Sequence, residues 1–443
     1  MSLERFLKNE SVLKVCKIYQ MLLKASKDKH VSFHTPGHKI GQWDITELSF
    51  SDNLSAPKGC ILEAERDIAA IFKAEKSFIL TDGSTSGVLS MLYAAKLSGA
   101  KKIAFCEASH QSVYNGCAAL GLVPLLFSLK KKKGIPLPFT KETLVQQADI
   151  FKEADAVLLT SPDYYGNVAD LKSVRSYCDE MGKLLLVDGA HGGHLHFAYE
   201  QYAGSYADVW VDGVHKSLPA FTQGAVVSAK KMLSEKLRQA VNVFRTTSPS
   251  YPIMASVEYA VKFPRNIQLE TAVNKWKANH LERVYANEDW TKLCAVFEKN
   301  AFKAKKALEK EGIYAEFCDG NVLAFYLSPA LEQQDFELLT KRLEGLFSEY
   351  PILENDEDRC ALKEIEKENP PTVYEMKETE WLELKKAEDR ICAACCGLFP
   401  PCAPLLNVGE KVTKEKITLL ENASNVFGVS ENKILVFQEK TKE

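Results

Sequence analysis

The chain has 443 residues, of which 46% are hydrophobic and 26% are charged. This balance is typical of a globular protein and excludes a disordered chain or one embedded in a membrane. The 56 basic and 59 acidic residues give a net charge of −3, so no electrostatic feature favours nucleic acid as a partner.

The first residues predict an amphipathic helix rather than a signal peptide. Charged residues, among them Glu4, Arg5 and Lys8, interrupt the apolar positions. No run approaches the ~18 apolar residues that span a bilayer. We therefore expect a cytoplasmic protein with no membrane partner, whose 12 cysteines are thiols or metal ligands rather than disulfides.

Short apolar runs alternate with helical patterns from about residue 76 to residue 230. The predicted strands are SFIL, KIAFC, LVPLLF, AVLLT, KLLLV, DVWV and GAVVS, and the predicted helices cover 87–97, 111–120, 171–180 and 232–241. This alternation predicts an α/β fold with a mainly parallel sheet covered by helices.

The chain is expected to divide into an N-terminal arm (1–58), a large domain (59–300) and a small C-terminal α+β domain (301–443). Residues 255–312 have few Gly or Pro and predict long helices. In the small domain, the patterns predict strands at YAEFC and NVLAFYLS, helices at FELLTKRLEGLF and TEWLELKKAEDRICAA, and an acidic surface linker at NDEDRCALKEIEKENPP.

Chemically reactive residues follow three of the predicted strands. KLLLV is followed by Asp188, DVWV leads to Lys216, and SFIL leads to TDGSTSG. Ligands of open α/β sheets bind beyond the carboxyl ends of the strands. These residues are therefore candidates for one binding site.

Each candidate has a functional and a structural interpretation. Lys216 is either a desolvated amine that forms a Schiff base or a solvated surface lysine. Asp188 follows a very apolar strand and needs a cationic partner, which is either a pyridinium nitrogen or a structural ion pair or helix cap. His110, after KIAFC, either lies against a planar cofactor or satisfies a local hydrogen bond.

The segment TDGSTSG places Ser84, Thr85 and Ser86 at the start of a predicted helix. Hydroxyls and free N–H groups there bind phosphate, although similar segments also cap helices that bind no ligand. A Schiff-base lysine, a carboxylate for a ring nitrogen, a phosphate loop and a stacking histidine together describe a pyridoxal 5'-phosphate (PLP) site.

Several motifs resemble those of the ornithine/lysine/arginine decarboxylase family of bacterial, aspartate-aminotransferase-fold (PLP fold type I) enzymes. They are, in chain order, FHTPGHK, LSAPKGCILEAERDIA, TDGSTSG, SPDYYGNVADL, LLLVDGAHGGHLHF, DGVHKSLPAFTQGA, TTSPSY and FPPCAPLL. The resemblance covers residues 31–260 and 385–412. It implies a short form without the receiver-like N-terminal domain, assembled as a homodimer or larger homo-oligomer.

The resemblance implies a role for each candidate residue. Lys216, Asp188 and His191 would be catalytic: Lys216 binds the cofactor covalently, Asp188 pairs with the pyridine nitrogen, and His191 lies near the 3-hydroxyl. His110 would stack on the cofactor. The phosphate would be held by Ser84, Thr85, Ser86 and His215.

The activity that the resemblance implies is decarboxylation of lysine, ornithine or arginine to an amine and CO2, a reaction of polyamine biosynthesis. Three residues depart from the family pattern. Gly189 replaces a Glu, Gly213 replaces a Ser that touches the phosphate, and Cys402 replaces a Gly near the substrate. Lys216 and Asp188 match the pattern, so these departures concern substrate choice more than cofactor binding.

Three alternatives stay open from the sequence. One is another fold type I enzyme, an aminotransferase or lyase, although Arg342, Arg359 and Arg390 lie in no recognisable motif for a substrate carboxylate. A second is a cofactor-binding protein with little catalysis. The third is metal binding, but we expect no metal, either at HGGHLH or at the cysteines Cys392, Cys395, Cys396 and Cys402.

Overall fold

The computed structural model describes residues 7–27, 31–39, 43–132, 135–352, 378–398, 404–422 and 425–438. Its centre is a seven-stranded sheet with the order β1-β9-β8-β7-β6-β2-β3. The strands are β1 (Lys76–Leu80), β2 (Lys102–Cys106), β3 (Val123–Phe127), β6 (Ala156–Thr160), β7 (Leu184–Gly189), β8 (Val209–Asp212) and β9 (Ala225–Ala229). The predicted mainly parallel sheet is confirmed, because only β9 runs against its neighbours β1 and β8.

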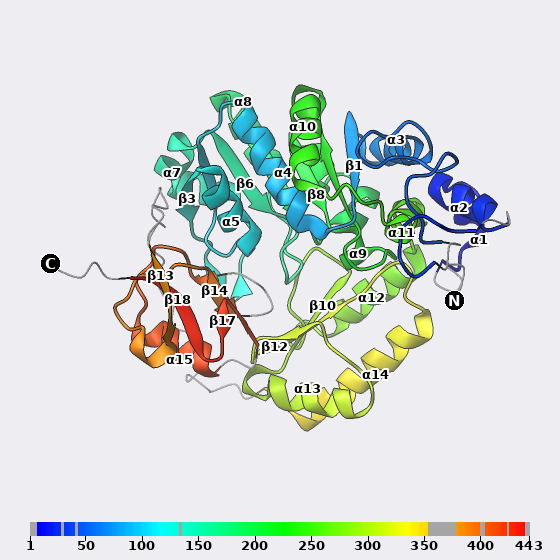
Figure 1. The fold of residues 1–443 in the computed structure, drawn as a ribbon. Helices are drawn as coiled ribbons and strands as arrows, with labels where there is room; N and C mark the ends of the chain where they lie inside the picture. Colours follow the sequence, from blue (N-terminus) through cyan, green and yellow to red (C-terminus); the bar gives the residue numbers. More distant parts are fainter. Residues whose placement is uncertain are drawn as a thin grey trace.

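Helices cover both faces of this sheet (Figure 1). One face packs on α4 (Gly83–Leu97), α5 (Gln111–Leu120) and α10 (Ser234–Phe244), and the other on α3 (Cys60–Phe72), α8 (Leu171–Met181) and α11 (Tyr251–Lys262). Successive side chains of a strand alternate between the two faces. In β7, Leu186 packs in the core on the α4, α5 and α10 side, whereas Leu185 and Val187 pack in the core on the α3, α8 and α11 side.

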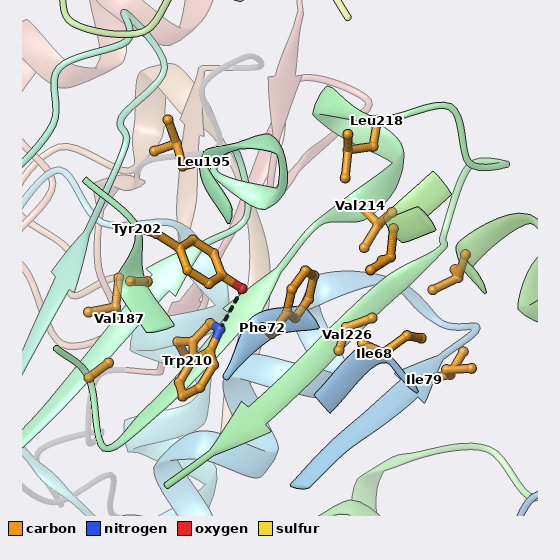
Figure 2. Packing of buried hydrophobic residues seen from close by; sticks show 14 of the residues in the cluster. Ile68, Phe72, Ile79, Val187, Leu195, Tyr202, Trp210, Val214, Leu218 and Val226 are labelled. Carbon is orange, nitrogen blue, oxygen red and sulfur yellow. Dashed lines mark hydrogen bonds between the residues drawn. The ribbon is translucent and has the colours of Figure 1, made fainter. Parts of the chain in front are cut away.

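The core on the α3, α8 and α11 side contains buried hydrogen bonds among large aromatic rings. Tyr202 and Trp210 lie beside Phe72 (Figure 2). Trp210 Nε1 donates a hydrogen bond to Tyr202 Oη (3.0 Å), and Tyr202 Oη donates to Asp212 Oδ2 (2.7 Å). These bonds satisfy polar atoms that burial would otherwise leave without partners.

The N-terminal arm packs against the large unit through α1 (Glu10–Leu13) and α2 (Lys17–Lys27). Glu258 of α11 accepts hydrogen bonds from the Lys17 and Ile18 amides (2.7 and 2.9 Å). These amides belong to the first turn of α2 and have no partner within the helix. A side chain far along the sequence therefore caps this helix.

Shorter elements complete the large unit. They are β4 (Lys131–Lys132), β5 (Ile135–Pro136), α6 (Lys141–Gln146), α7 (Ala148–Glu153) and α9 (Val214–Ser217), with 3-10 turns at Gly193–Phe197, Ala203–Ser205 and Lys231–Leu233. No helix within the described ranges is long and apolar enough to cross a bilayer.

A smaller unit follows the large one. Its sheet has the order β10-β12-β11 and packs against three helices. The elements are α12 (Ile267–Asn279), β10 (Lys292–Val296), α13 (Ala301–Lys310), β11 (Phe317–Cys318), β12 (Val322–Tyr326) and α14 (Gln333–Glu349), with a 3-10 turn at Glu298–Asn300. Because β10 pairs with β12, a boundary at residue 300 would split this sheet, and we propose that the boundary precedes β10.

The prediction of long helices over 255–312 was wrong at β10. KLCAV is a short apolar run, which periodicity alone does not distinguish from a buried helical segment. The antiparallel pairing of β10 with β12 makes it a strand.

The C-terminal part forms two further three-stranded sheets, β13-β18-β17 and β15-β14-β16. Their elements are β13 (Thr379–Glu383), β14 (Cys396–Leu398), β15 (Pro404–Leu406), α15 (Lys414–Asn422), β16 (Val426–Phe427), β17 (Val429–Ser430) and β18 (Lys433–Phe437), with a 3-10 turn at Leu384–Lys386. In Figure 1 this part and the smaller unit lie below the seven-stranded sheet. The predicted acidic linker lies outside the described residues.

The helix predicted at TEWLELKKAEDRICAA was wrong. Its first residues form β13, which pairs with β18, and exposure alternates along it. Glu, Leu and Lys favour helix, but pairing with a distant strand outweighs that weak local preference.

One buried ion pair joins several elements of the large unit. Arg245 donates to Glu65 Oε1 (3.1 Å), to the Ile79 carbonyl (3.0 Å) and to the Leu54 carbonyl (2.7 Å). We predict that Arg245→Ala lowers the free energy of unfolding by about 3–5 kcal/mol, because it leaves the buried Glu65 carboxylate without its cation. Urea denaturation measures the change.

The matched control is Arg238→Ala, because Arg238 forms an exposed pair with Glu235. Its removal is expected to cost less than about 1 kcal/mol. Equal losses in the two variants would contradict the importance of the buried pair.

Candidate active site

A cavity of about 280 Å³ lies at the carboxyl ends of the parallel strands. Every predicted site residue except Ser86 lines it: Ser84, Thr85, His110, Asp188, His191, His215 and Lys216. They come from the start of α4, the start of α5, the end of β7 and the short helix α9. The sheet topology therefore brings together residues that are up to 132 positions apart, from Ser84 to Lys216.

Lys216 and His191 face each other in this cavity. Lys216 Nζ lies 3.3 Å from His191 Nε2 and 5.8 Å from the centre of the Tyr164 ring. Burial, with the nearby positive charges of Lys216 and Lys292, holds the pKa of His191 well below its usual range. A neutral His191 can accept a hydrogen bond from Lys216 at Nε2.

Asp188 is a buried carboxylate with few partners for its charge. It is 3% exposed and accepts one hydrogen bond, from the Ala190 amide (3.1 Å). It forms no ion pair with another side chain in the part of the chain that the structure describes. A buried carboxylate of this kind needs a cation, so the cavity has a place for a positively charged ligand atom beside Asp188.

The first turn of α4 is open to an anion. Asp82, at its N-cap, makes no side-chain capping bond, and Gly83 adopts a φ of +82°, which favours glycine. Ser84 Oγ is buried without a hydrogen-bond partner among the described residues. Free amides and a hydroxyl at a helix N-terminus bind phosphate well.

Ser86 differs from Ser84 in its contacts. Its hydroxyl donates to Asp82 Oδ1 (2.6 Å) and lies 3.0 Å from the Gly83 carbonyl. Ser86 is therefore placed to support the loop rather than to bind a ligand in the cavity.

Two histidines at the cavity wall are fixed by backbone contacts. His110 Nδ1 accepts from the Ser112 amide (3.1 Å) and so caps α5. His215 Nδ1 lies 2.9 Å from the Gly224 carbonyl, to which it can donate. Burial lowers the pKa of both rings. A phosphate near His215 Nε2 would favour the protonated ring, which could then donate to it.

Sequence reasoning missed several residues of the wall. Ser109 and Thr160 line the cavity, and their hydroxyl oxygens are buried without a hydrogen-bond partner among the described residues. The same is true of Nδ1 of His191, which the sequence did predict. Thr160 ends β6 and is paired with Asp188 in the sheet register. Its position at a strand end could have marked Thr160 as a site residue. Nothing in the sequence shows that the Ser109 side chain points into the cavity.

The HGGHLH histidines separate in the structure. His194 Nε2 contacts Asp289 Oδ1 (2.8 Å) in a buried pair, and His196 Nδ1 contacts the Gly193 carbonyl (2.7 Å). No group of three or more His, Cys, Asp or Glu side chains within the described ranges is arranged to hold a metal ion.

The cysteine cluster is buried in the C-terminal part. Cys392 and Cys396 have sulfur atoms 3.9 Å apart, and Cys395 packs in the core beside α4 and α5. Cys402 lies outside the described residues.

Comparison with protein families gives a match to "Orn/Lys/Arg decarboxylase, major domain" over residues 42–283. This range contains the whole candidate site. The chain belongs to the Orn/Lys/Arg decarboxylase family. The resemblance predicted from the motifs is therefore confirmed.

Individual relatives are distant but cover most of the chain. An uncharacterized Bacillus subtilis protein, YaaO, is 26% identical over 96% of this chain and 99% of its own length. Arginine decarboxylase of the same species is 27% identical over 91% of this chain and 92% of its own.

Solved structures agree on the fold. Constitutive lysine decarboxylase of Escherichia coli matches with a TM-score of 0.67 at 18% identity, covering 97% of this chain and 82% of that one. The predicted PLP fold type I architecture is confirmed by this likeness and by the central sheet.

The buried ring of His196 makes stability depend on pH. It contacts Phe72 and Tyr202, and burial lowers its pKa to about 4. Unfolded His196 binds a proton below about pH 6.5, but the folded protein does not until about pH 4. This histidine is therefore expected to lower the free energy of unfolding by about 2 kcal/mol as the pH falls from 7 to about 5.

We predict that His196→Phe removes this loss. Urea denaturation at both pH values should show the variant gaining about 2 kcal/mol relative to wild type as the pH falls. A constant difference between the two proteins would contradict the burial of a neutral His196.

Proposed function

We propose that the protein decarboxylates a basic amino acid (lysine, ornithine or arginine) to the corresponding amine and CO2, with PLP as cofactor. The observation that carries this proposal is the convergence of Lys216, His191 and the uncompensated Asp188 in one cavity of a family member. Lys216 offers an amine, His191 a neutral imidazole and Asp188 a carboxylate.

The cavity fits PLP by its unsatisfied polar atoms. Ser84 Oγ, Ser109 Oγ, Thr160 Oγ1 and His191 Nδ1 line it, buried and without described partners. Such atoms are rare in folded proteins unless a ligand or water satisfies them.

The residues that would hold the cofactor follow from these contacts. Lys216 would bind it covalently, Asp188 would face its pyridine nitrogen, and His110 would lie against its ring. Ser84, Thr85 and His215 would hold its phosphate. Bound PLP supplies an electron-accepting ring that stabilises the electron pair left on the α-carbon when CO2 departs.

The chain's own groups handle charge and protons. Asp188 stabilises a positive charge at the ring-nitrogen position, which a low local dielectric makes effective. Lys216 Nζ and His191 Nε2 are 3.3 Å apart, so a proton can pass between them and return to the α-carbon from this side.

Gly213 lies against two neighbours that restrict larger residues. A Cβ there would lie 2.4 Å from the Ala190 carbonyl oxygen and 2.8 Å from Ser84 Oγ. Ser84 Oγ thus occupies space close to the place of the family's serine, and we propose that it supplies the phosphate contact instead.

Gly189 likewise lies close to a neighbouring strand, which restricts larger residues. A Cβ there would lie 2.9 Å from the Val211 carbonyl oxygen and 3.3 Å from Asp212 Oδ1. Asp212, fixed by Tyr202, stands near the region that the family's glutamate side chain would need.

The contacts of the candidate arginines do not favour an aminotransferase. Arg342 pairs with Glu311, and Arg390 with Glu380, both at 2.7 Å. No arginine is among the described residues that line the cavity, and Arg359 lies outside the described ranges. A homodimer or larger homo-oligomer remains part of the proposal, because the family resemblance implies it.

We predict that Lys216→Ala abolishes both the visible absorbance band of bound PLP and CO2 release from lysine, ornithine and arginine. The reason is the loss of the only amine proposed to bind the cofactor covalently. Spectrophotometry and a CO2-release assay measure the two effects. Lys230→Ala, which removes an amine over the Trp210 ring, is the control and should retain both properties.

We predict that Ser84→Ala weakens PLP binding by about tenfold or more, because a hydrogen bond to a charged group contributes ~1.5–3 kcal/mol. Ser86→Ala is the matched control, since the Ser86 hydroxyl is directed to Asp82. Titration of apoprotein with PLP measures both affinities. A larger loss in Ser86→Ala than in Ser84→Ala would reverse the assignment.

A further inference from the structure

Two carboxylates line the cavity within the described ranges, Asp188 and Asp163. Asp188 is already assigned to the pyridine nitrogen. A basic amino acid carries a second positive group at the end of its side chain, and a partly desolvated site must offer that group an anion. This reasoning rests on the proposed function, because it concerns the substrate of the same cavity.

Asp163 is held rigidly but without a cation. Its Oδ1 accepts from the amides of Tyr165 (2.8 Å) and Asn167 (2.9 Å), and its Oδ2 accepts from Asn167 Nδ2 (2.8 Å). These donors are neutral, as is the nearby Gly166 amide, and Asp163 forms no ion pair among the described residues. Burial raises the pKa of this carboxyl to about 6, so it is mostly ionised at neutral pH.

Asn167 fixes the orientation of Asp163 from behind. Its Nδ2 also donates to the Pro136 carbonyl (2.9 Å), and its Oδ1 accepts from Tyr285 Oη (3.0 Å). Asp163 therefore lies where the β4–β5 hairpin, the segment after β6 and the smaller unit meet.

Aromatic side chains lie beside both Asp163 and His191. Tyr164, the next residue, has its ring 4.5 Å from that of His191. The Tyr326 hydroxyl donates to the Tyr164 carbonyl (3.0 Å), and the Tyr326 ring is 5.4 Å from His191. Aromatic rings suit the methylene chain of a long amino acid, and their faces also attract cations.

We infer that Asp163 binds the distal cation of the substrate side chain and that this cation is the ω-ammonium of lysine or ornithine rather than the guanidinium of arginine. Each carboxylate oxygen offers about two acceptor positions. Oδ1 of Asp163 already accepts from two amides, so a ligand cation is received mainly by Oδ2. A single oxygen suits a compact ammonium, whereas a guanidinium is best bound by both carboxylate oxygens.

The test measures binding rather than turnover, with the PLP-loaded protein and calorimetric titration. The probes are 1,5-diaminopentane, 1,4-diaminobutane, agmatine and the monoamine pentylamine. Wild type should bind its better diamine about tenfold or more tightly than either pentylamine or agmatine. Asp163→Asn should bind that diamine no more tightly than pentylamine, because its amide keeps an acceptor for the backbone but loses the charge.

Asp163→Ser is a second variant, in case the asparagine amide opposes the Asn167 amide and disturbs the fold. It should lose the same preference. Asp319→Asn is the control, because Asp319 accepts from the Oη of Tyr165, a neighbour of Asp163 (2.8 Å), but does not line the cavity. This variant should keep the diamine preference.

A diamine preference that persists in both folded Asp163 variants would overturn the inference, as would tighter binding of agmatine than of either diamine by wild type. CO2 release from the three basic amino acids is measured separately. Diamine binding that depends on Asp163 without CO2 release would reject the proposed decarboxylation and keep this assignment of the binding site.

Discussion

The buried negative charge of Asp188 is the constraint around which the candidate site is built. It ends a strand whose other residues are apolar, and it has one hydrogen bond and no described cation. Parallel neighbours β6 and β8 place Thr160 and the segment leading to Lys216 at the same edge. Burial lowers the pKa of His110 and His191, so these rings provide no cation for Asp188.

The segment after Asp188 couples this site to the smaller unit. His191 enters the cavity, while His194, three residues later, pairs with Asp289. Although burial raises the pKa of Asp289, His194 and Lys292 together hold it well below its usual range. Lys292 also lies 4.4 Å over the ring of Tyr326, which flanks His191. One short turn thus places His191 in the cavity and binds the smaller unit through His194.

The two glycines that depart from the family pattern have close neighbours in this arrangement. At Gly213 a side chain would meet Ala190 and Ser84, and at Gly189 it would meet Val211 and Asp212. Asp212 is fully buried, and burial raises the pKa of its carboxyl to about 7. In the proposed site, phosphate binding and the region behind Asp188 would therefore use different side chains from the family pattern.

The sequence by itself determined the central sheet, the roles of Asp188 and Lys216 as candidates, and the family. Apolar runs of strand length, separated by helical patterns, reflect burial of strands on both faces, and this is a local property. Strand ends and motifs are local too. The sequence was therefore sufficient for residues whose task depends on their position along a strand.

Only the tertiary structure decided which side chains enter the cavity. Ser84 and Ser86 are two residues apart, yet one is left unsatisfied at the cavity and the other bonds to Asp82. Asp163 and Thr160 belong to the wall because of how their segment meets β5 and the smaller unit. Likewise, β10 and β13 are strands because β12 and β18 pair with them. The physical reason is the same in each case: the partner that satisfies the group is distant in sequence, so no local pattern specifies it.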